Sequence, residues 1–239
     1  VVGARNCTPY GRDMARMFSY RLAAAGVFVI SGMALGIDGW GHQGALEAGG
    51  ETYAVLGSGV MRCYPSCHQN LYESIVRHGG VISEFPVYAR AKPVFFPMRN
   101  RIISGLSDGI LVVEAREKSG SLITADAALE QGKDVFVIPG RIGDELSVGC
   151  NRLIRMGAVP VLTPDDILDY YGVKTSDGSR NVNETEQKIL AFLGGKTMHM
   201  DEISAGLSLP MTQLLKCMIV LQKKGYVIEV GRNFFMKKI

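Results

Sequence analysis

The sequence predicts an α/β protein with a Rossmann-like, doubly wound, mostly parallel sheet, followed by a small C-terminal winged-helix domain. Three observations lead to this prediction. Nearly continuous apolar runs alternate with helical patterns over residues 1–171, as is typical of parallel strands buried on both faces. Residues 172–184 hold almost no side chain that could enter a core. Residues 185–239 carry a pattern of three helices and a hairpin.

Several short segments predict the strands of the parallel sheet. The strongest signals are apolar runs at residues 27–30, 52–56, 109–113 and 134–138. Weaker candidates lie at residues 1–2, 81–82 and 159–161. Helical patterns separate these segments at residues 10–25, 37–48, 69–78, 122–131 and 149–156. The repeated order of strand, helix and strand predicts a parallel sheet with helices on both of its faces.

Residues 172–184 separate the two predicted domains, and their small, polar composition is typical of a flexible linker. Beyond them, Asn183 and Glu186 have the spacing of a capping box, which predicts a helix that continues to about Leu193. The elements expected next are helices at 200–205 and 209–224 and hairpin strands at 226–230 and 234–237. The predicted core face of the longer helix consists of Met211, Leu214, Leu215, Met218 and Leu221.

Composition excludes several classes of protein. The sequence is 47% hydrophobic and 21% charged, and none of its segments approaches the ~20 apolar residues of a membrane-spanning helix. The first residues lack the pattern of a signal peptide, so we expect a cytoplasmic protein. Because the chain lacks an initiator Met and starts inside an expected strand, we also expect it to be a fragment of a longer protein.

The cysteines and charges narrow the function further. Five scattered cysteines indicate reduced thiols rather than a disulfide framework. The sequence Cys63-x-x-x-Cys67-His68 could begin a zinc site, but no second pair of ligands follows at a matching spacing, so we expect no metal and no cofactor. The net charge is −1 over residues 1–171 and +4 over residues 185–239. A basic C-terminal domain is compatible with nucleic acid and also with ordinary solvated helices.

Glycine-rich turns follow several of the predicted strands. In a doubly wound sheet, ligands bind beyond the carboxyl ends of the strands, where backbone amides at helix N-termini favour phosphate oxygens. Four such turns together predict a site for a polyphosphate or a nucleic-acid backbone, although each alone is equally typical of a tight turn. The candidate phosphate-binding residues in these turns are Gly3, Arg5, Ser31, Gly32, Gly57, Gly59, Ser119, Gly120, Ser121 and Thr124.

Arginines supply further candidates. The guanidinium of Arg5 can bond two phosphate oxygens, and the alternative is a surface ion pair. Arg99, Asn100 and Arg101 follow two phenylalanines at residues 95–96. We expect all of these residues in one loop, where cations and aromatic rings would suit a single strand of nucleic acid. The alternative is that the two phenylalanines only anchor the loop.

An ordered set of short phrases runs through residues 1–171. The phrases are Val-Gly-Ala-Arg (2–5), Ser-Gly-Met-Ala-x-Gly-Ile-Asp (31–38), Leu-Gly-Ser-Gly (56–59), Tyr-Pro (64–65), Ser-Glu-Phe-Pro (83–86), Phe-Pro-x-Arg-Asn-Arg-Ile-Ile-Ser-Gly-Leu-Ser (96–107), Val-Val-Glu-Ala (112–115), Ser-Gly-Ser-Leu-Ile-Thr (119–124) and Val-Phe-Val-Ile-Pro-Gly (135–140). Together they resemble the DprA/Smf (DNA-processing protein A) family. The last domain resembles the variable C-terminal domain of that family with weaker motifs.

The resemblance implies a homodimer that binds single-stranded DNA in a basic pocket at the strand ends. It also implies contact with RecA and loading of RecA onto DNA covered by single-strand-binding protein, in natural transformation and related recombination. Two departures stand out. Ala4 replaces a frequent Ser, and Ser66 stands where members often carry a basic residue, so one phosphate contact is missing or supplied by His68. The N-terminal helical domain of many members is absent from this sequence.

Two other functions fit part of the sequence. Residues 118–124 resemble the glycine-rich turn of lysine-decarboxylase-like nucleotide phosphoribohydrolases, but the glutamate expected after the Thr is missing, because residues 125–127 read Ala-Asp-Ala. A transcription regulator would explain the last domain alone. Asp38 and His42 lie four residues apart on one helix face and could form an acid/base pair, although a helix-capping or packing pair is the favoured interpretation. We therefore expect no catalytic residue.

Overall fold

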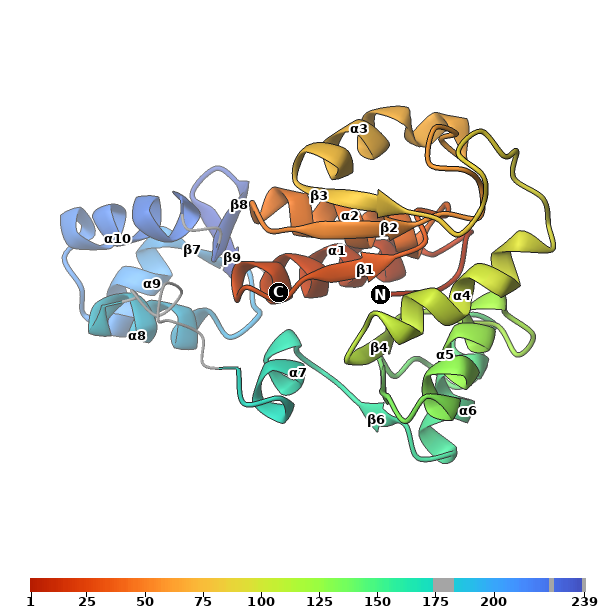
Figure 1. Cartoon of the computed structure of the whole chain (residues 1–239). Coiled ribbons are helices and arrows are strands. Elements are labelled where there is room, and N and C mark those ends of the chain that lie inside the picture. Colours follow the sequence, from red (N-terminus) through yellow and green to blue (C-terminus); the bar gives the residue numbers. More distant parts are fainter. Residues whose placement is uncertain (174–182, 224–225, 238–239) are drawn as a thin grey trace. The chain divides into compact units, whose positions relative to one another are not determined.

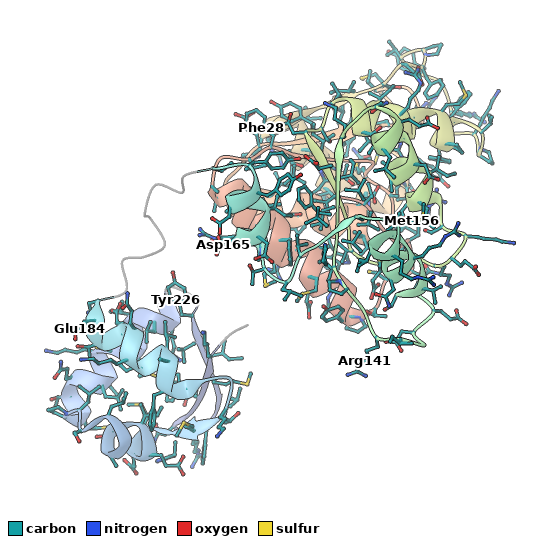
Figure 2. The ribbon with its side chains drawn as sticks, turned by 90° about the horizontal axis from the view of Figure 1, so that it is seen from below. Phe28, Arg141, Met156, Asp165, Glu184 and Tyr226 are labelled. Atoms are coloured by element: carbon teal, nitrogen blue, oxygen red, sulfur yellow. The ribbon has the colours of Figure 1, made fainter. Side chains whose placement is uncertain are left out.

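The computed structural model describes residues 1–173, 183–223 and 226–237. The chain forms two compact units, Val1–Thr175 and Ser176–Ile239, whose side chains are drawn in Figure 2. Most of the predicted linker, residues 174–182, lies outside the described residues. Its beginning differs from the expectation, because Val173 packs against the core of the first unit and its N–H donates to the Leu168 carbonyl at 2.9 Å.

The first unit contains parallel strands in two groups (Figure 1). One group consists of β1 (Val29–Ser31), β2 (Thr52–Val55) and β3 (Gly79–Ile82), and the other of β4 (Gly109–Val112), β5 (Asp134–Val137) and β6 (Val159–Pro160). Val1 and Val2 lie between the groups. The amine of Val1 donates to the Ile30 carbonyl at 2.9 Å, and Val2 forms a parallel bridge with Val112.

The chain therefore builds its sheet outward from the centre. It adds β1, β2 and β3 in order on one side of Val2, and then crosses to the other side to add β4, β5 and β6. This order confirms the predicted doubly wound, parallel architecture. Ligands of such sheets bind at the topological switch point, where neighbouring strands lead into connections on opposite faces. Here that point lies beyond the carboxyl ends of Val2 and β4.

Helices cover both faces of the sheet. One face packs against α1 (Pro9–Ala24), α2 (Ile37–Glu47) and α7 (Pro164–Tyr170), and the other against α4 (Phe95–Gly105), α5 (Gly120–Glu130) and α6 (Val148–Arg155). Successive residues of β4 alternate between the two cores, since Leu111 belongs to the first and Ile110 and Val112 to the second. Side chains of a strand alternate in this way because the backbone is pleated. The helix α3 (Gln69–Arg77), preceded by the short 3₁₀ helix η1 (Ser66–His68), packs against β2 and β3.

Two predictions about these elements are wrong, and one helix was not predicted. Residues 95–105, expected as a loop, form α4, because Pro97 lies in the first turn, where its missing N–H costs nothing. The unpredicted helix α7 starts with Pro164 behind a capping box of Thr163 and Asp166. Strand β1 starts at Val29, whereas the expected strand began two residues earlier. Phe28 is 58% exposed and lies at the surface of the unit (Figure 2).

The second unit contains the predicted helices and hairpin, with one additional short strand. Its elements are α8 (Glu184–Leu193), β7 (Met198–His199), α9 (Met200–Leu207), α10 (Met211–Lys223), β8 (Val227–Gly231) and β9 (Phe234–Lys237), and the strands pair antiparallel in the order β7-β9-β8. The predicted capping box is confirmed, because Asn183 and Glu186 each accept the backbone N–H of the other, at 2.8 and 3.1 Å.

The buried face of α10 differs from the prediction. Leu214, Cys217, Met218 and Leu221 are buried, whereas Leu215 is 51% exposed. The spacing of the four buried residues follows the helical repeat, so they share one face of α10. Leu215 directly follows Leu214 in the helix and therefore points away from that face.

Among the described residues, no single helix is long and apolar enough to cross a membrane. Only α9 and Met211–Gln222 together reach that length and composition, and they are bent by 115°.

Candidate functional site

A cavity of about 420 Å³ opens at the topological switch point of the first unit. Its walls come from the turn after Val2, the first turns of α4 and α5, and the connection after β4. The cavity brings together most of the predicted site. The predicted residues that line it are Gly3, Arg5, Arg99, Asn100, Ser119, Gly120, Ser121 and Thr124.

The N-terminus of α5 opens into this cavity. Ser119 caps the helix, and its hydroxyl accepts the N–H of Ser121 at 3.4 Å. Open space surrounds the position where a side chain would begin at Gly120. The helix dipole and the first N–H groups of a helix favour an anion at this end. The start of α5 can therefore receive a phosphate oxygen.

Two other helix N-termini at the same edge already have acceptors from the protein. Thr8, which caps α1, donates its N–H and its hydroxyl to the buried carboxylate of Glu114, at 2.9 and 2.5 Å. The first N–H of α2, from Ile37, donates to the Ala4 carbonyl at 3.2 Å. Of these three helix starts, the described structure leaves that of α5 for a ligand.

Arg5 lies over this cavity. Its guanidinium carbon lies 5.2 Å from the centroid of the Phe96 ring, and no carboxylate pairs with it among the described residues. Gly36 fixes the turn that carries Arg5, because a Cβ at Gly36 would approach the Ala4 carbonyl oxygen to 2.2 Å and its φ is 75°. The alternative of a surface ion pair therefore has no support in the described part of the chain.

Two cations of the site were missed in the sequence analysis. Arg116 and Lys118 line the cavity and are exposed. Arg116 pairs weakly with Glu145 at 3.5 Å, and Lys118 has no carboxylate partner among the described residues. Their position in the sequence could have revealed them, since both lie in the connection between β4 and α5, on the carboxyl side of a central strand.

Arg99 contributes to the wall in a different way. It is 3% exposed, and its Nη1 donates to the Gly32 carbonyl at 2.8 Å and to the Val55 carbonyl. Burial lowers its pKa, and the nearby carboxylate of Asp38 opposes this shift. Arg99 therefore ties α4 to the ends of β1 and β2, and its role as a phosphate ligand stays a prediction.

Five predicted residues do not line the cavity. Two of them, Ser31 and Gly32, are buried and make structural contacts. The Ser31 hydroxyl donates to the Val1 carbonyl at 2.5 Å. The N–H of Gly32 donates to Asp38 at 3.1 Å, and a Cβ at Gly32 would collide with the Arg99 guanidinium. Both residues shape the edge of β1 from inside the protein.

The other three lie farther along the sheet edge or at the surface. Gly57 allows close packing, because a Cβ there would lie 2.7 Å from the Phe96 ring. Gly59 packs equally closely against the backbone of the loop after β3. Arg101 forms an exposed ion pair with Glu84. As DNA ligands these three residues remain predictions.

Asp38 and His42 form separate structural contacts. Thr52 donates its hydroxyl to the Val29 carbonyl at 2.7 Å, so the Nδ1 of His42, 2.6 Å from that hydroxyl, carries the hydrogen. Burial lowers the pKa of His42 to about 3. Asp38 and His42 therefore bond to different residues, which favours structural roles over an acid/base pair, and His42 is neutral at physiological pH.

The Cys63-Cys67-His68 cluster also makes local contacts. All five cysteines are free thiols. The thiol of Cys63 donates to the Pro65 carbonyl at 3.4 Å, and the Nδ1 of His68 lies 3.0 Å from the Met33 carbonyl oxygen. Within the described ranges, no three His, Cys, Asp or Glu side chains are grouped as a metal site would need.

Comparison with known proteins identifies the family. The family model of DNA recombination-mediator protein A matches residues 1–172. Protein Smf of Escherichia coli strain K12 is 38% identical over 247 residues, which cover 98% of this chain and 66% of the relative. DNA processing protein DprA of Streptococcus pneumoniae is 43% identical over 168 residues and is covered to 59%. The chain thus spans 66% or less of the length of these relatives.

Solved structures agree with this result. DNA processing protein A of Streptococcus pneumoniae is similar with a TM-score of 0.66 and 40% identity, over 70% of this chain and 59% of that one. The Helicobacter pylori protein, whose structure describes a single-stranded DNA binding mode, has a TM-score of 0.66 and 28% identity, over 71% and 77% of the two chains. This chain therefore belongs to the DNA recombination-mediator protein A (DprA/Smf) family.

Proposed function

We propose that this chain binds single-stranded DNA through its phosphates at the switch-point cavity and acts as a recombination mediator. One observation carries the proposal: the open N-terminus of α5 shares a cavity with Arg5 and Lys118, neither of which has a carboxylate partner in the described part of the chain. Phe96 adds an aromatic ring beside Arg5. Cations with aromatic rings suit a flexible strand, because phosphates and base faces are then both accessible. The Helicobacter pylori relative supports the choice of single-stranded DNA.

The proposed mediator works without a chemical step. It holds the strand, contacts RecA, and helps to load RecA onto DNA covered by single-strand-binding protein, in the cytoplasm, during natural transformation and related recombination. The cavity offers hydrogen-bond donors and charge. Within the described residues, its one carboxylate, Asp38, accepts an N–H from Gly32. The phosphoribohydrolase alternative is not favoured, because no glutamate follows Thr124 at the expected place. Release of free base from a nucleotide by the purified chain would revive it.

Two features of the proposal concern the whole chain. Joining two cavities in a homodimer would make the second contact intramolecular and raise avidity by roughly 10²–10⁴. Sedimentation of the chain at high concentration tests this, and a strict monomer would contradict it.

Residues 174–182 are proposed as part of the linker to a winged-helix domain that begins near residue 185. Limited proteolysis should cut there and release a first unit that still binds single-stranded DNA.

The decisive experiment compares two arginines of the first unit. Fluorescence anisotropy with a labelled oligothymidine at about 100 mM salt measures the dissociation constant. Arg5→Ala should weaken binding about tenfold or more, since a charge-assisted hydrogen bond is lost.

Arg77→Ala is the matched control. Arg77 is an exposed arginine at the end of α3, which leads into the start of β3. It therefore lies near the amino ends of the strands, whereas the cavity lies at their carboxyl ends. This variant should bind like the wild type. Equal affinities of Arg5→Ala and wild type would place the DNA site elsewhere.

A further inference from the structure

A second exposed surface lies beside the cavity, on the loops that follow β2 and β3. We call it the β2/β3 loop surface and define it as residues 59–64 and 86–94. Figure 1 shows these loops, in orange and yellow, at one edge of the sheet. They are bonded to each other, because the Gly59 N–H donates to the Ala89 carbonyl at 2.9 Å and the Met61 N–H to the Val87 carbonyl at 3.0 Å.

The β2/β3 loop surface combines cations with large apolar side chains. Arg62, Arg90 and Lys92 are its charged residues, and the two segments contain no Asp or Glu. None of the three cations has a carboxylate partner within the described residues. Tyr88 is 68% exposed and Met61 is 61% exposed. Large side chains at such exposure, among unpaired cations, mark a binding surface rather than a core.

This surface is continuous with the cavity. The ring of Tyr64, which belongs to the surface, lies 5.5 Å from the ring of Phe96 in the cavity wall. Phe96 packs closely on Gly57 at the start of the same loop. Because β1, β2 and β3 are parallel and adjacent, the loops after them lie at the same edge as the switch point. A strand leaving Arg5 can therefore run over Phe96 and Tyr64 without crossing the sheet.

We propose that the β2/β3 loop surface is a second DNA subsite, on which the strand continues beyond the cavity. Its cations contact the next phosphates, and Tyr88 stacks on a base. The occupant is single-stranded DNA because three cations without an acid complement a phosphate backbone, and an exposed ring suits an unpaired base. The inference rests on the proposed function, since the cavity must hold the first part of the same strand.

Two oligothymidines test the subsite on the full chain, one of about 5 nucleotides and one of about 15. Tyr88→Ala should weaken binding of the long strand about fivefold or more and leave the short strand unchanged. The double variant Arg62→Ala/Arg90→Ala should lower the dependence of log affinity on log salt by about 0.7 per charge, again for the long strand alone. Tyr88→Phe keeps the ring and should bind both strands like the wild type.

The outcomes separate this inference from the proposed function. Suppose that Arg5→Ala lowers the affinity for both strands while the loop variants bind the long strand like the wild type. The cavity then remains the proposed DNA site, the second DNA subsite is rejected, and the β2/β3 loop surface is assigned to a protein partner instead. If Arg5→Ala changes neither strand, the proposed function itself fails. Photo-crosslinking gives an independent readout. A long strand carrying iodouracil should crosslink to Tyr88, and absence of that crosslink from every tested position would also overturn the subsite.

Discussion

Two regions of the first unit, the turn after Val2 and helix α4, bring an arginine to the same aromatic ring. The guanidinium carbon of Arg5 lies 5.2 Å from the centroid of the Phe96 ring, and that of Arg99 lies 6.0 Å from it. Arg5 is exposed and has no carboxylate partner among the described residues, whereas Arg99 is buried and bonded to two backbone carbonyls. The charge of Arg99 is also balanced by Asp38 nearby. Of two arginines at one site, the one that bonds to no carboxylate or carbonyl of the described residues is the one available to a phosphate.

The largest expected effect is on stability at Arg99. Arg99→Met keeps the stem but removes the donors to the Gly32 and Val55 carbonyls, and it removes a buried cation that faces Asp38. The free energy of unfolding should fall by about 2–5 kcal/mol. Urea titration monitored by Trp40, the single tryptophan of the sequence, reports on this unit.

The control for that prediction is the other arginine. Arg5→Met should change the free energy of unfolding by no more than about 0.5 kcal/mol, because its side chain is exposed. Equal destabilisation by the two substitutions would remove the distinction between a structural and a ligand-binding arginine.

A pH titration extends the same contrast to a buried histidine. The folded protein lowers the pKa of His42 from 6.5 to about 3, so the unfolded chain binds a proton that the folded protein excludes. The contribution of His42 to stability is complete above pH 6.5 and is lost as the pH falls from 6.5 towards 3. Between these two pKa values, His42 contributes a slope of up to about 1.4 kcal/mol per pH unit to the free energy of unfolding. His42→Asn should remove that part of the slope in urea titrations between these limits, and an unchanged slope would contradict the neutral assignment.

The smallest expected effect separates the two cations after β4. Lys118 has no carboxylate partner in the described residues, whereas Arg116 is weakly paired with Glu145. Lys118→Ala should therefore reduce the salt dependence of log affinity for an oligothymidine by about 0.7, and Arg116→Ala by less. Anisotropy at several salt concentrations measures both slopes. A larger reduction of the salt slope for Arg116→Ala than for Lys118→Ala would show that Arg116, not Lys118, is the main phosphate contact after β4.

The sequence was sufficient to predict most of the fold. Apolar runs located the central strands, and the turns at Gly3 and Gly120 were correctly expected at the strand ends. Helix α4 was missed because Pro97 is typical of a loop, although a proline is tolerated in a first turn. Helix α7 was missed although its capping box is visible in the sequence.

The roles of individual site residues were harder to predict. Arg99 is bonded to Gly32 and Val55, which are 67 and 44 residues away in the chain. No local pattern distinguishes such an arginine from the exposed Arg101 two positions later. Gly57 and Gly59 show the same limit, since the packing that requires glycine involves residues after β3 and in α4. Long-range contacts decide which members of a motif remain free for a ligand.

The proposed site for single-stranded DNA is the switch point of the first unit, at Arg5 and the start of α5. The most direct test is a titration of the isotope-labelled full chain with a short oligothymidine, followed by amide chemical shifts in NMR spectra. The largest shifts should occur at the amides of Arg5, Gly120 and Ser121. If the largest shifts occur in α10 and those three amides do not move, DNA binding belongs to the second unit and the proposed site is wrong.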